Sequence, residues 1–146
     1  NFFKSDRRYY KKVNPINDKL YETAIKNKYN IIFDRTGTNF VSYYNDVIKK
    51  IKDEGYNIIL CIVYNNFTNV KSRIKKREEE TGRAVNETYA KKSYRDLTFN
   101  IPKYVNLNCD SVDEMFVFDN TSTSIELLYR YFCKKNEKII SINNLI

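Results

Sequence analysis

The chain has 146 residues, 42% of them apolar, which is enough for one domain with a buried core. It carries 26 Lys and Arg against 18 Asp and Glu, and the excess is concentrated in residues 1–28 and 71–92. A net charge of +8 is compatible with a solvated surface or with an anionic partner, whether nucleotide, nucleic acid or acidic membrane. No apolar run approaches the roughly 20 residues that cross a bilayer, so we expect a soluble protein without a membrane partner.

The three cysteines, Cys61, Cys109 and Cys133, are widely spaced, and the chain contains no histidine. Neither a disulfide framework nor a zinc site is therefore expected, and no metal-ligating set is predicted. A reducing location, cytoplasmic or otherwise intracellular, is the simpler expectation.

The first residues, 1–14, are basic and aromatic without clean periodicity, and Pro15 closes them off. We expect a basic aromatic arm there, available to a protein partner or, because aromatics among basic residues can stack bases, to nucleic acid. A helix is predicted over 18–28, where apolar residues recur at helical spacing: Leu20, Tyr21, Ala24 and Ile25.

A strand–helix–strand pattern follows. Residues 30–34 are a short apolar run ending in a carboxylate, as in a strand buried on both faces. Thr38 or Asn39 can cap a helix that ends at Gly55, and 56–64 is a second uniformly apolar strand. The pattern predicts a βαβ unit with parallel strands.

The middle of the chain predicts two helices of different character. Residues 69–80 are helical but mostly charged, and the helix stops at Thr81 and Gly82. Asn86 begins a second helix with an apolar stripe, which we expect Pro102 to end.

The last part of the chain predicts a strand, a helix and an uncertain tail. Residues 114–118 are a third apolar strand, and Thr123 has capping-box spacing before a last helix that carries Phe132. The tail, 138–146, fits either an edge strand or a loose end. The expected fold class is α/β, a parallel sheet flanked by helices, in one domain covering 1–146.

Polar residues follow three of the predicted strands. In open parallel sheets ligands bind beyond the carboxyl ends of the strands, so residues 34–36, 65–66 and 119–120 should converge on one crevice. Asp34 there can hold magnesium through water or contact a substrate hydroxyl, or else serve as a helix cap or an ion-pair partner of Arg35. Asp119 is better explained as a cap or turn residue.

Three arginines lie in or just after the charged helix: Arg73, Arg77 and Arg83. The planar guanidinium suits bidentate phosphate binding, and a weakly packed segment beside a crevice is what a closing lid requires. Residues 69–85 are therefore a candidate lid. The alternative is an exposed helix with Glu/Arg pairs of small energetic value.

Several motifs follow one another in a fixed order: Asn-Ile-Ile-Phe-Asp34-Arg-Thr36-Gly37, Gly55-Tyr56-Asn-Ile-Ile-Leu, Val63-Tyr64, Arg73, Arg77, Gly82-Arg83, Val85, Val112-Asp113 and Phe118-Asp119-Asn120. Over about residues 28–120 this order resembles the zeta-toxin group of P-loop kinases. The resemblance implies a P-loop kinase-like fold and ATP-dependent transfer of a phosphoryl group to a small molecule or nucleotide sugar.

The resemblance also assigns roles to the candidate residues. Asp34 and Thr36 would lie on the substrate or magnesium side, and Asp34, Arg77 and Arg83 would be catalytic. Arg73 and Asn120 would contact the nucleotide. ATP and Mg²⁺ would be the cofactors of the complete protein, and a nucleotide and a small-molecule acceptor its partners.

The phosphate-gripping loop of this family is missing from the 146 residues. That loop needs GxxxxGK[ST], whereas the chain has three glycines, Gly37, Gly55 and Gly82, and none opens such a motif. We therefore expect the fold to be incomplete at its N-terminal side and this piece to be inactive by itself. The alternative is a non-enzymatic structural or interaction protein on a degenerate kinase scaffold.

Overall fold

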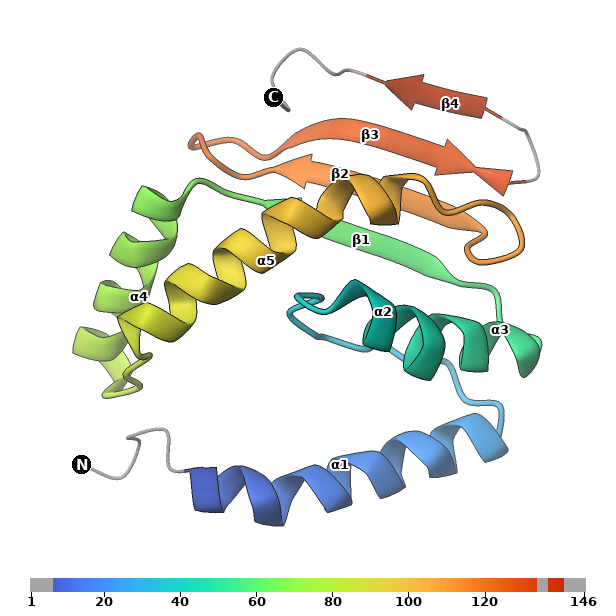
Figure 1. The fold of residues 1–146 in the computed structure, drawn as a ribbon, viewed down its shortest axis with the longest axis horizontal. Helices are drawn as coiled ribbons and strands as arrows, with labels where there is room; N and C mark the ends of the chain where they lie inside the picture. The colour runs from blue at the N-terminus through green and yellow to red at the C-terminus, as the bar shows by residue number, and fades with distance from the viewer. Residues whose placement is uncertain (1–6, 134–136, 141–146) are drawn as a thin grey trace.

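The computed structural model describes residues 7–133 and 137–140, with side chains described for 13–133 (Figure 1). The elements in chain order are α1 (Arg7–Lys26), α2 (Phe40–Tyr43), the π-helix η1 (Tyr44–Lys49), α3 (Lys50–Asp53), β1 (Ile59–Tyr64), α4 (Phe67–Thr81), α5 (Glu87–Val105), β2 (Glu114–Asp119), β3 (Glu126–Phe132) and β4 (Glu137–Ile140). No helix of the described residues is both long and apolar enough to cross a membrane.

The sheet is mixed, which corrects the expectation of a parallel sheet. Its order is β1-β2-β3-β4; β1 and β2 are parallel, while β2 with β3 and β3 with β4 are antiparallel. The α/β class is confirmed. The direction changes because α4 and α5 carry the chain back between β1 and β2, whereas only six residues separate β2 from β3 and allow a direct reversal.

The predicted last helix is wrong, because residues 126–132 form strand β3. The apolar residues that fit a helical stripe also fit a strand, on which Tyr129 and Tyr131 are 3% exposed and join the core. Pairing with β2 satisfies the backbone hydrogen-bonding groups of β3. This pairing outweighs the capping-box spacing at Thr123 that predicted a helix. The edge-strand alternative for the tail is confirmed at 138–140 by β4; residues 141–146 lie outside the described part.

Two prolines do not end their helices, contrary to expectation. Helix α1 begins at Arg7 and continues through Pro15, so residues 7–14 are helical rather than an irregular arm; residues 1–6 lie outside the described part. Helix α5 likewise continues through Pro102 to Val105. Both prolines are exposed, so water can satisfy the carbonyl that loses its helical partner.

The first predicted strand, 30–34, is not formed. These residues belong to no regular element, and the side chain of Ile32 is fully exposed at 102%. The predicted βαβ unit around the second helix is therefore wrong. The segment does not pair with β1, and a cavity is lined by residues of both.

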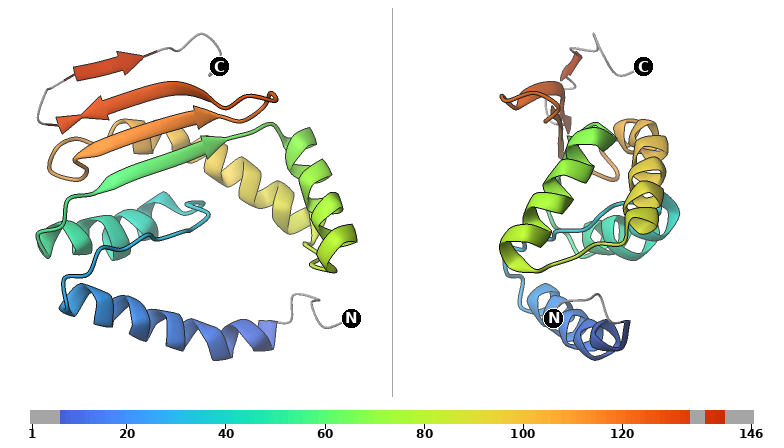
Figure 2. Two further views of the ribbon diagram at one scale, coloured as in Figure 1. Left: turned by 180° about the vertical axis from the view of Figure 1, so that it is seen from behind. Right: turned by 90° about the vertical axis from the view of Figure 1, so that its left-hand side faces the viewer.

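Strand β1 is buried on one face only, although its sequence predicted burial on both. Ile62 joins the core against α5, which contributes Ile101 and Tyr104. On the opposite face Ile59 is 60% and Val63 is 52% exposed. Figure 2 shows the strands from this side with no helix in front of them.

The predicted helix boundaries around β1 are confirmed. Asn39 caps α2 by accepting a hydrogen bond from the Ser42 amide, and the helical run ends before Gly55, which has φ 78°. Helix α4 ends at Thr81 because Gly82 adopts a left-handed conformation with φ 69°. Asn86 caps α5.

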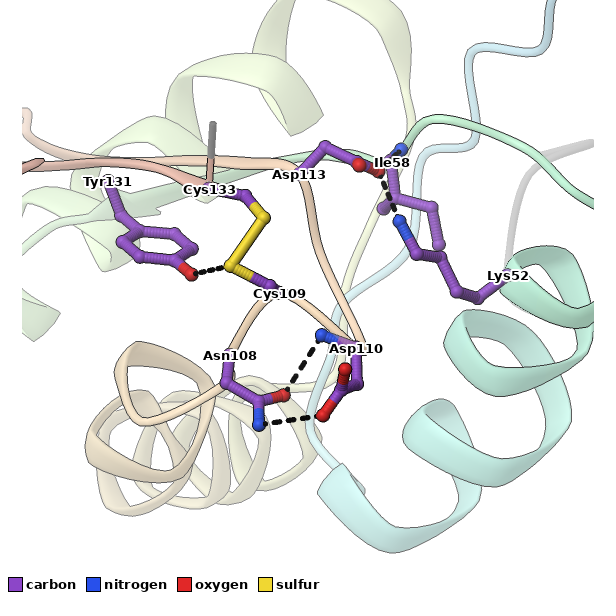
Figure 3. The surroundings of a disulfide bond; sticks show 8 residues. All are labelled: Lys52, Ile58, Asn108, Cys109, Asp110, Asp113, Tyr131 and Cys133. Carbon is purple, nitrogen blue, oxygen red and sulfur yellow. Dashed lines mark hydrogen bonds and ion pairs between the residues drawn. A yellow bond between two sulfur atoms is a disulfide. The ribbon is translucent and has the colours of Figure 1, made fainter. Parts of the chain in front are cut away.

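Cys109 and Cys133 form a disulfide, which overturns the expectation of no disulfide (Figure 3). Cys109 lies in the connection between α5 and β2, and Cys133 directly follows β3. Their Cα atoms are 5.1 Å apart because β2 and β3 pair antiparallel and bring the end of β3 beside the start of β2. The spacing of the two cysteines along the sequence does not predict that they lie close together.

We predict that reduction of this disulfide lowers the free energy of unfolding by about 3 kcal/mol, since the bond closes a loop between cysteines 24 residues apart. Urea denaturation with and without a reductant measures the change. The Cys61→Ser variant should show the same loss on reduction, because Cys61 is a free cysteine. Equal unfolding free energies in both redox states would contradict the prediction.

Candidate functional site

A cavity of about 1080 Å³ lies between the irregular segment 30–38 and strand β1. Every residue of β1 lines it, and α4 and α5 contribute further walls. Asn65 and Asn120 border it beyond the carboxyl ends of β1 and β2. The cavity therefore reaches the edge of the parallel pair where ligands bind in open sheets.

The structure brings most of the predicted site residues to this cavity. The lining includes Asp34, Thr36, Arg73, Arg77 and Asn120. Arg83 does not line it but lies exposed just beyond the end of α4. A role for Arg83 in a closing lid stays a prediction.

Arg73 is held at the carboxyl ends of the parallel strands. Its Nη2 donates to the Asn120 side-chain oxygen at 3.1 Å and lies 3.4 Å from the Asn120 carbonyl oxygen. The Asn120 amide in turn donates to the Tyr64 carbonyl at 2.9 Å, which extends the β1–β2 pairing by one bond. Asn69 adds a 2.6 Å bond from its side chain to the Thr121 carbonyl. The first half of α4 is thereby fastened to the loop after β2.

Arg77 lies one helical turn beyond Arg73 on the same side of α4. Both residues line the cavity, and both are exposed. The i,i+4 ion pairs of this helix are made by lysines, with Lys76 lying 3.8 Å from Glu80 as one example. The alternative of arginines consumed by Glu/Arg pairing is therefore not the arrangement seen.

The wall formed by residues 34–38 is fixed by α5. The Tyr104 hydroxyl donates to the Gly37 carbonyl at 2.8 Å, and the Asn100 side chain donates to the Thr38 carbonyl at 2.9 Å. Gly37 has φ 60°, a conformation that other residues rarely adopt, and a Cβ there would lie 3.4 Å from the Tyr104 hydroxyl oxygen. Asp34 and Thr36 are exposed on this anchored segment.

The two carboxylates that the sequence placed at the ends of predicted strands have different surroundings. Asp119 accepts a hydrogen bond from the Thr121 amide at 2.8 Å, which confirms its interpretation as a turn residue. Arg35 places its guanidinium 4.8 Å from the centre of the Phe33 ring. Asp34 is the one of the two carboxylates that lines the cavity.

Two of the tyrosines that line the cavity form a pair that the sequence did not predict. Tyr64 ends β1, and Tyr94 comes from α5. A hydrogen bond with Tyr94, assisted by burial, raises the pKa of the Tyr64 hydroxyl above its usual value. The position of Tyr64 at the end of a predicted strand could have marked it as a candidate. Its partner Tyr94 lies 30 residues away in the sequence, so only the fold shows that the two meet.

The donor set of the cavity favours anions. Guanidinium groups, hydroxyls and side-chain amides dominate it, with Asp34 as the carboxylate. Among the described residues no group of three or more His, Cys, Asp or Glu side chains gathers where it could hold a metal ion. Charged guanidinium groups at the carboxyl ends of parallel strands suit phosphate oxygens.

An α/β domain with arginines at the carboxyl ends of a parallel strand pair is consistent with a P-loop kinase-like protein. The family model for zeta toxin matches residues 8–129. The chain belongs to the zeta toxin family. No curated protein and no solved structure gave a significant match.

We predict that Tyr104 makes folding pH-dependent in the alkaline range. Burial raises the pKa of Tyr104 to about 12, from about 10 when unfolded, so its contribution to stability is complete below pH of about 10 and falls as the pH rises toward about 12. Tyr104→Phe should lower the unfolding free energy by about 1 kcal/mol at neutral pH, through loss of the bond to Gly37, and should flatten the alkaline decline.

Urea denaturation across this pH range measures both effects. Tyr89→Phe is the matched control, because Tyr89 lies on the same helix and is exposed. The unfolding free energy of the Tyr104→Phe variant should still fall somewhat at alkaline pH, since burial also raises the pKa of Tyr21 to about 12. An unchanged slope in Tyr104→Phe would contradict the prediction.

Proposed function

We propose that this chain is the lid-and-acceptor part of an ATP-dependent phosphotransferase that acts on a small molecule or nucleotide sugar. The observation that carries the proposal is the shared cavity: Arg73 and Arg77 of α4 line it together with Asp34 and Thr36 of the opposite wall. Membership of the zeta toxin family supports the same reaction class.

Phosphoryl transfer depends mainly on positioning and on neutralising the charge of the transferred group. Arg77 is the residue that we assign to the developing charge, because its side chain is exposed in the cavity and carries one positive charge. Arg73 is tethered to Asn120, so it would hold the nucleotide rather than move with the transferred phosphoryl group. Asn120 would border the nucleotide on the adenine side.

Asp34 and Thr36 are suited to the acceptor side. The carboxylate of Asp34 can accept a hydrogen bond from the acceptor hydroxyl and take up its proton as the terminal phosphoryl group of ATP bonds to the acceptor oxygen and its bond to ADP breaks. Anchoring of the neighbouring Gly37 and Thr38 by α5 keeps this wall at a constant position. Orientation of this kind is a large part of the rate advantage in group transfer.

ATP and Mg²⁺ fit the residues present to different degrees. Arg73 and Arg77 match the negative charge of a triphosphate. Magnesium commonly takes one or two carboxylates together with substrate phosphate oxygens and waters, which is compatible with Asp34 as a contributor. When bound, Mg²⁺ would supply additional neutralisation of phosphate charge.

A second candidate is a non-enzymatic interaction protein that keeps the kinase scaffold. The exposed apolar face of β1 favours it, because such faces commonly serve as contact surfaces. This candidate predicts no nucleotide affinity in the natural protein.

The test is nucleotide binding and turnover by the natural protein, isolated at its full length. We expect ATP binding that requires Mg²⁺ and release of ADP in the presence of a phosphoryl acceptor. Asp34→Asn should keep ATP binding and lose most of the transfer, because it retains the size but not the basicity of the carboxylate. Absence of ATP binding would refute the proposal and favour the interaction protein.

Arg77→Ala should lower kcat/KM for transfer by about a hundredfold, the loss typical of one group that stabilises transition-state charge. Lys76→Ala is the matched control: Lys76 is the preceding residue on α4, is exposed, and does not line the cavity. Steady-state kinetics distinguish the two. Equal effects of both substitutions would mean that Arg77 acts only through the general charge of the helix.

A further inference from the structure

A second groove, of about 870 Å³, lies between the start of α2 and the middle of α5. It has only Thr38, Tyr94 and Thr98 in common with the site cavity, so α5 contributes a wall to both. None of the residues that the sequence predicted for the candidate site lines this groove. The proposed function therefore gives it no role.

The two walls of the groove are fastened to each other. The side chain of Asn100, which is 7% exposed, donates to the carbonyl oxygens of Thr38 and Asp96, both at 2.9 Å. The Phe40 ring packs edge-on against the Tyr104 ring, with the ring centres 4.9 Å apart. A partner would therefore meet a preformed groove, which lowers the entropic cost of binding.

Two exposed apolar side chains line the groove. Val41 of α2 is 64% exposed and Phe99 of α5 is 72% exposed, and neither belongs to the hydrophobic core. Apolar side chains of this size gain free energy when a partner covers them. A single exposed apolar residue is common on protein surfaces, but two that line the same groove favour a docking surface.

The groove also carries a net positive charge. Three cations, Lys92, Arg95 and Lys103, line it together with the carboxylate of Asp96. Asp96 is ion-paired with Lys92, and within the part of the chain whose side chains are described neither Arg95 nor Lys103 has an acidic ion-pair partner. The Lys103 ammonium lies 4.6 Å from the centre of the Phe99 ring, so positive charge and apolar surface adjoin.

We propose that this groove is the docking site for an acidic segment of a partner protein. An apolar side chain of the segment packs on Val41 and Phe99, and its carboxylates pair with Arg95 and Lys103. Residues 95, 99 and 103 follow one another at four-residue spacing and share one face of α5, so a short segment can reach all of them. The groove is distinct from the site cavity, and the proposal does not depend on the proposed function.

An acidic protein segment fits the groove better than the other anionic partners. Nucleic acid phosphates recur along the strand and require a row of free cations, whereas Lys92 is held by Asp96, whose own carboxylate would repel a phosphate. The apolar side chains of Val41 and Phe99 match a protein side chain. A second copy of the chain is disfavoured by its net charge of +8, since like charges oppose association.

Selection from a phage library of random short peptides tests the proposal without a known partner. The natural protein, isolated at its full length, is the immobilised target. We expect the selected peptides to be enriched in Asp and Glu beside Leu, Ile or Phe. In fluorescence anisotropy, Phe99→Ala and Arg95→Glu should each weaken the binding of a labelled selected peptide about tenfold.

The same helix supplies two matched controls. Tyr89 is an exposed aromatic residue like Phe99, and Lys91 is exposed and basic like Arg95, yet neither lines the groove. Tyr89→Ala and Lys91→Glu should change the affinity by less than about twofold. All four positions are exposed, so each variant should keep the fold, which circular dichroism verifies. Added salt should weaken peptide binding more in the unsubstituted protein than in Arg95→Glu.

The results that would overturn the proposal are distinct from one another. Failure to select any peptide, selected peptides without acidic enrichment, or equal affinity of all four variants would remove the groove as a docking site for an acidic segment. Tighter binding of a single-stranded RNA that Arg95→Glu abolishes would assign the groove to nucleic acid. Self-association in sedimentation that Phe99→Ala abolishes would assign it to a second copy. None of these readouts involves ATP, so the proposed function can fail while the docking site stands.

Discussion

The parallel pairing of β1 with β2 determines where every part of the candidate site lies. Its register runs from Ile59 opposite Glu114 to Tyr64 opposite Asp119, and the bond from the Asn120 amide to the Tyr64 carbonyl closes it. Because both strands end at the same edge, the start of α4 and the loop after β2 meet there. Arg73 can then reach Asn120, and the cavity opens beside the strand ends.

The opposite end of the sheet is held by Asp113. One of its carboxylate oxygens accepts from the Ile58 amide at 2.7 Å and from the Lys52 ammonium at 2.6 Å (Figure 3). Its carbonyl accepts from the Cys133 amide. One residue thus joins α3, the start of β1 and the end of β3. The disulfide lies beside it, so covalent and polar constraints concentrate at the end of the sheet away from the site.

Local chemistry explains which predictions succeeded. The Asn39 cap and the left-handed Gly82 act on their own backbone neighbours, so their effect can be seen in a short stretch of sequence. Asp34, Arg73 and Arg77 line one cavity although 30–34 forms no strand, so three strand ends at one sheet edge are not the reason, and their role in a site stays a prediction. The strand predicted at 30–34 and the helix predicted at 123–132 were wrong. The secondary structure of both segments depends on whether another strand pairs with them.

By itself the sequence determined the α/β class, the charged helix with its arginines, the helix caps at Asn39 and Asn86, and the family. These properties depend on side chains close together in the chain or on the order of motifs. Only the tertiary structure decided that β3 and β4 run antiparallel, that Cys109 meets Cys133, and that within the described part of the chain β1 pairs with β2 alone and has one exposed face. The physical reason is that strand pairing satisfies backbone hydrogen bonds between distant segments, and no local pattern specifies which segments those are.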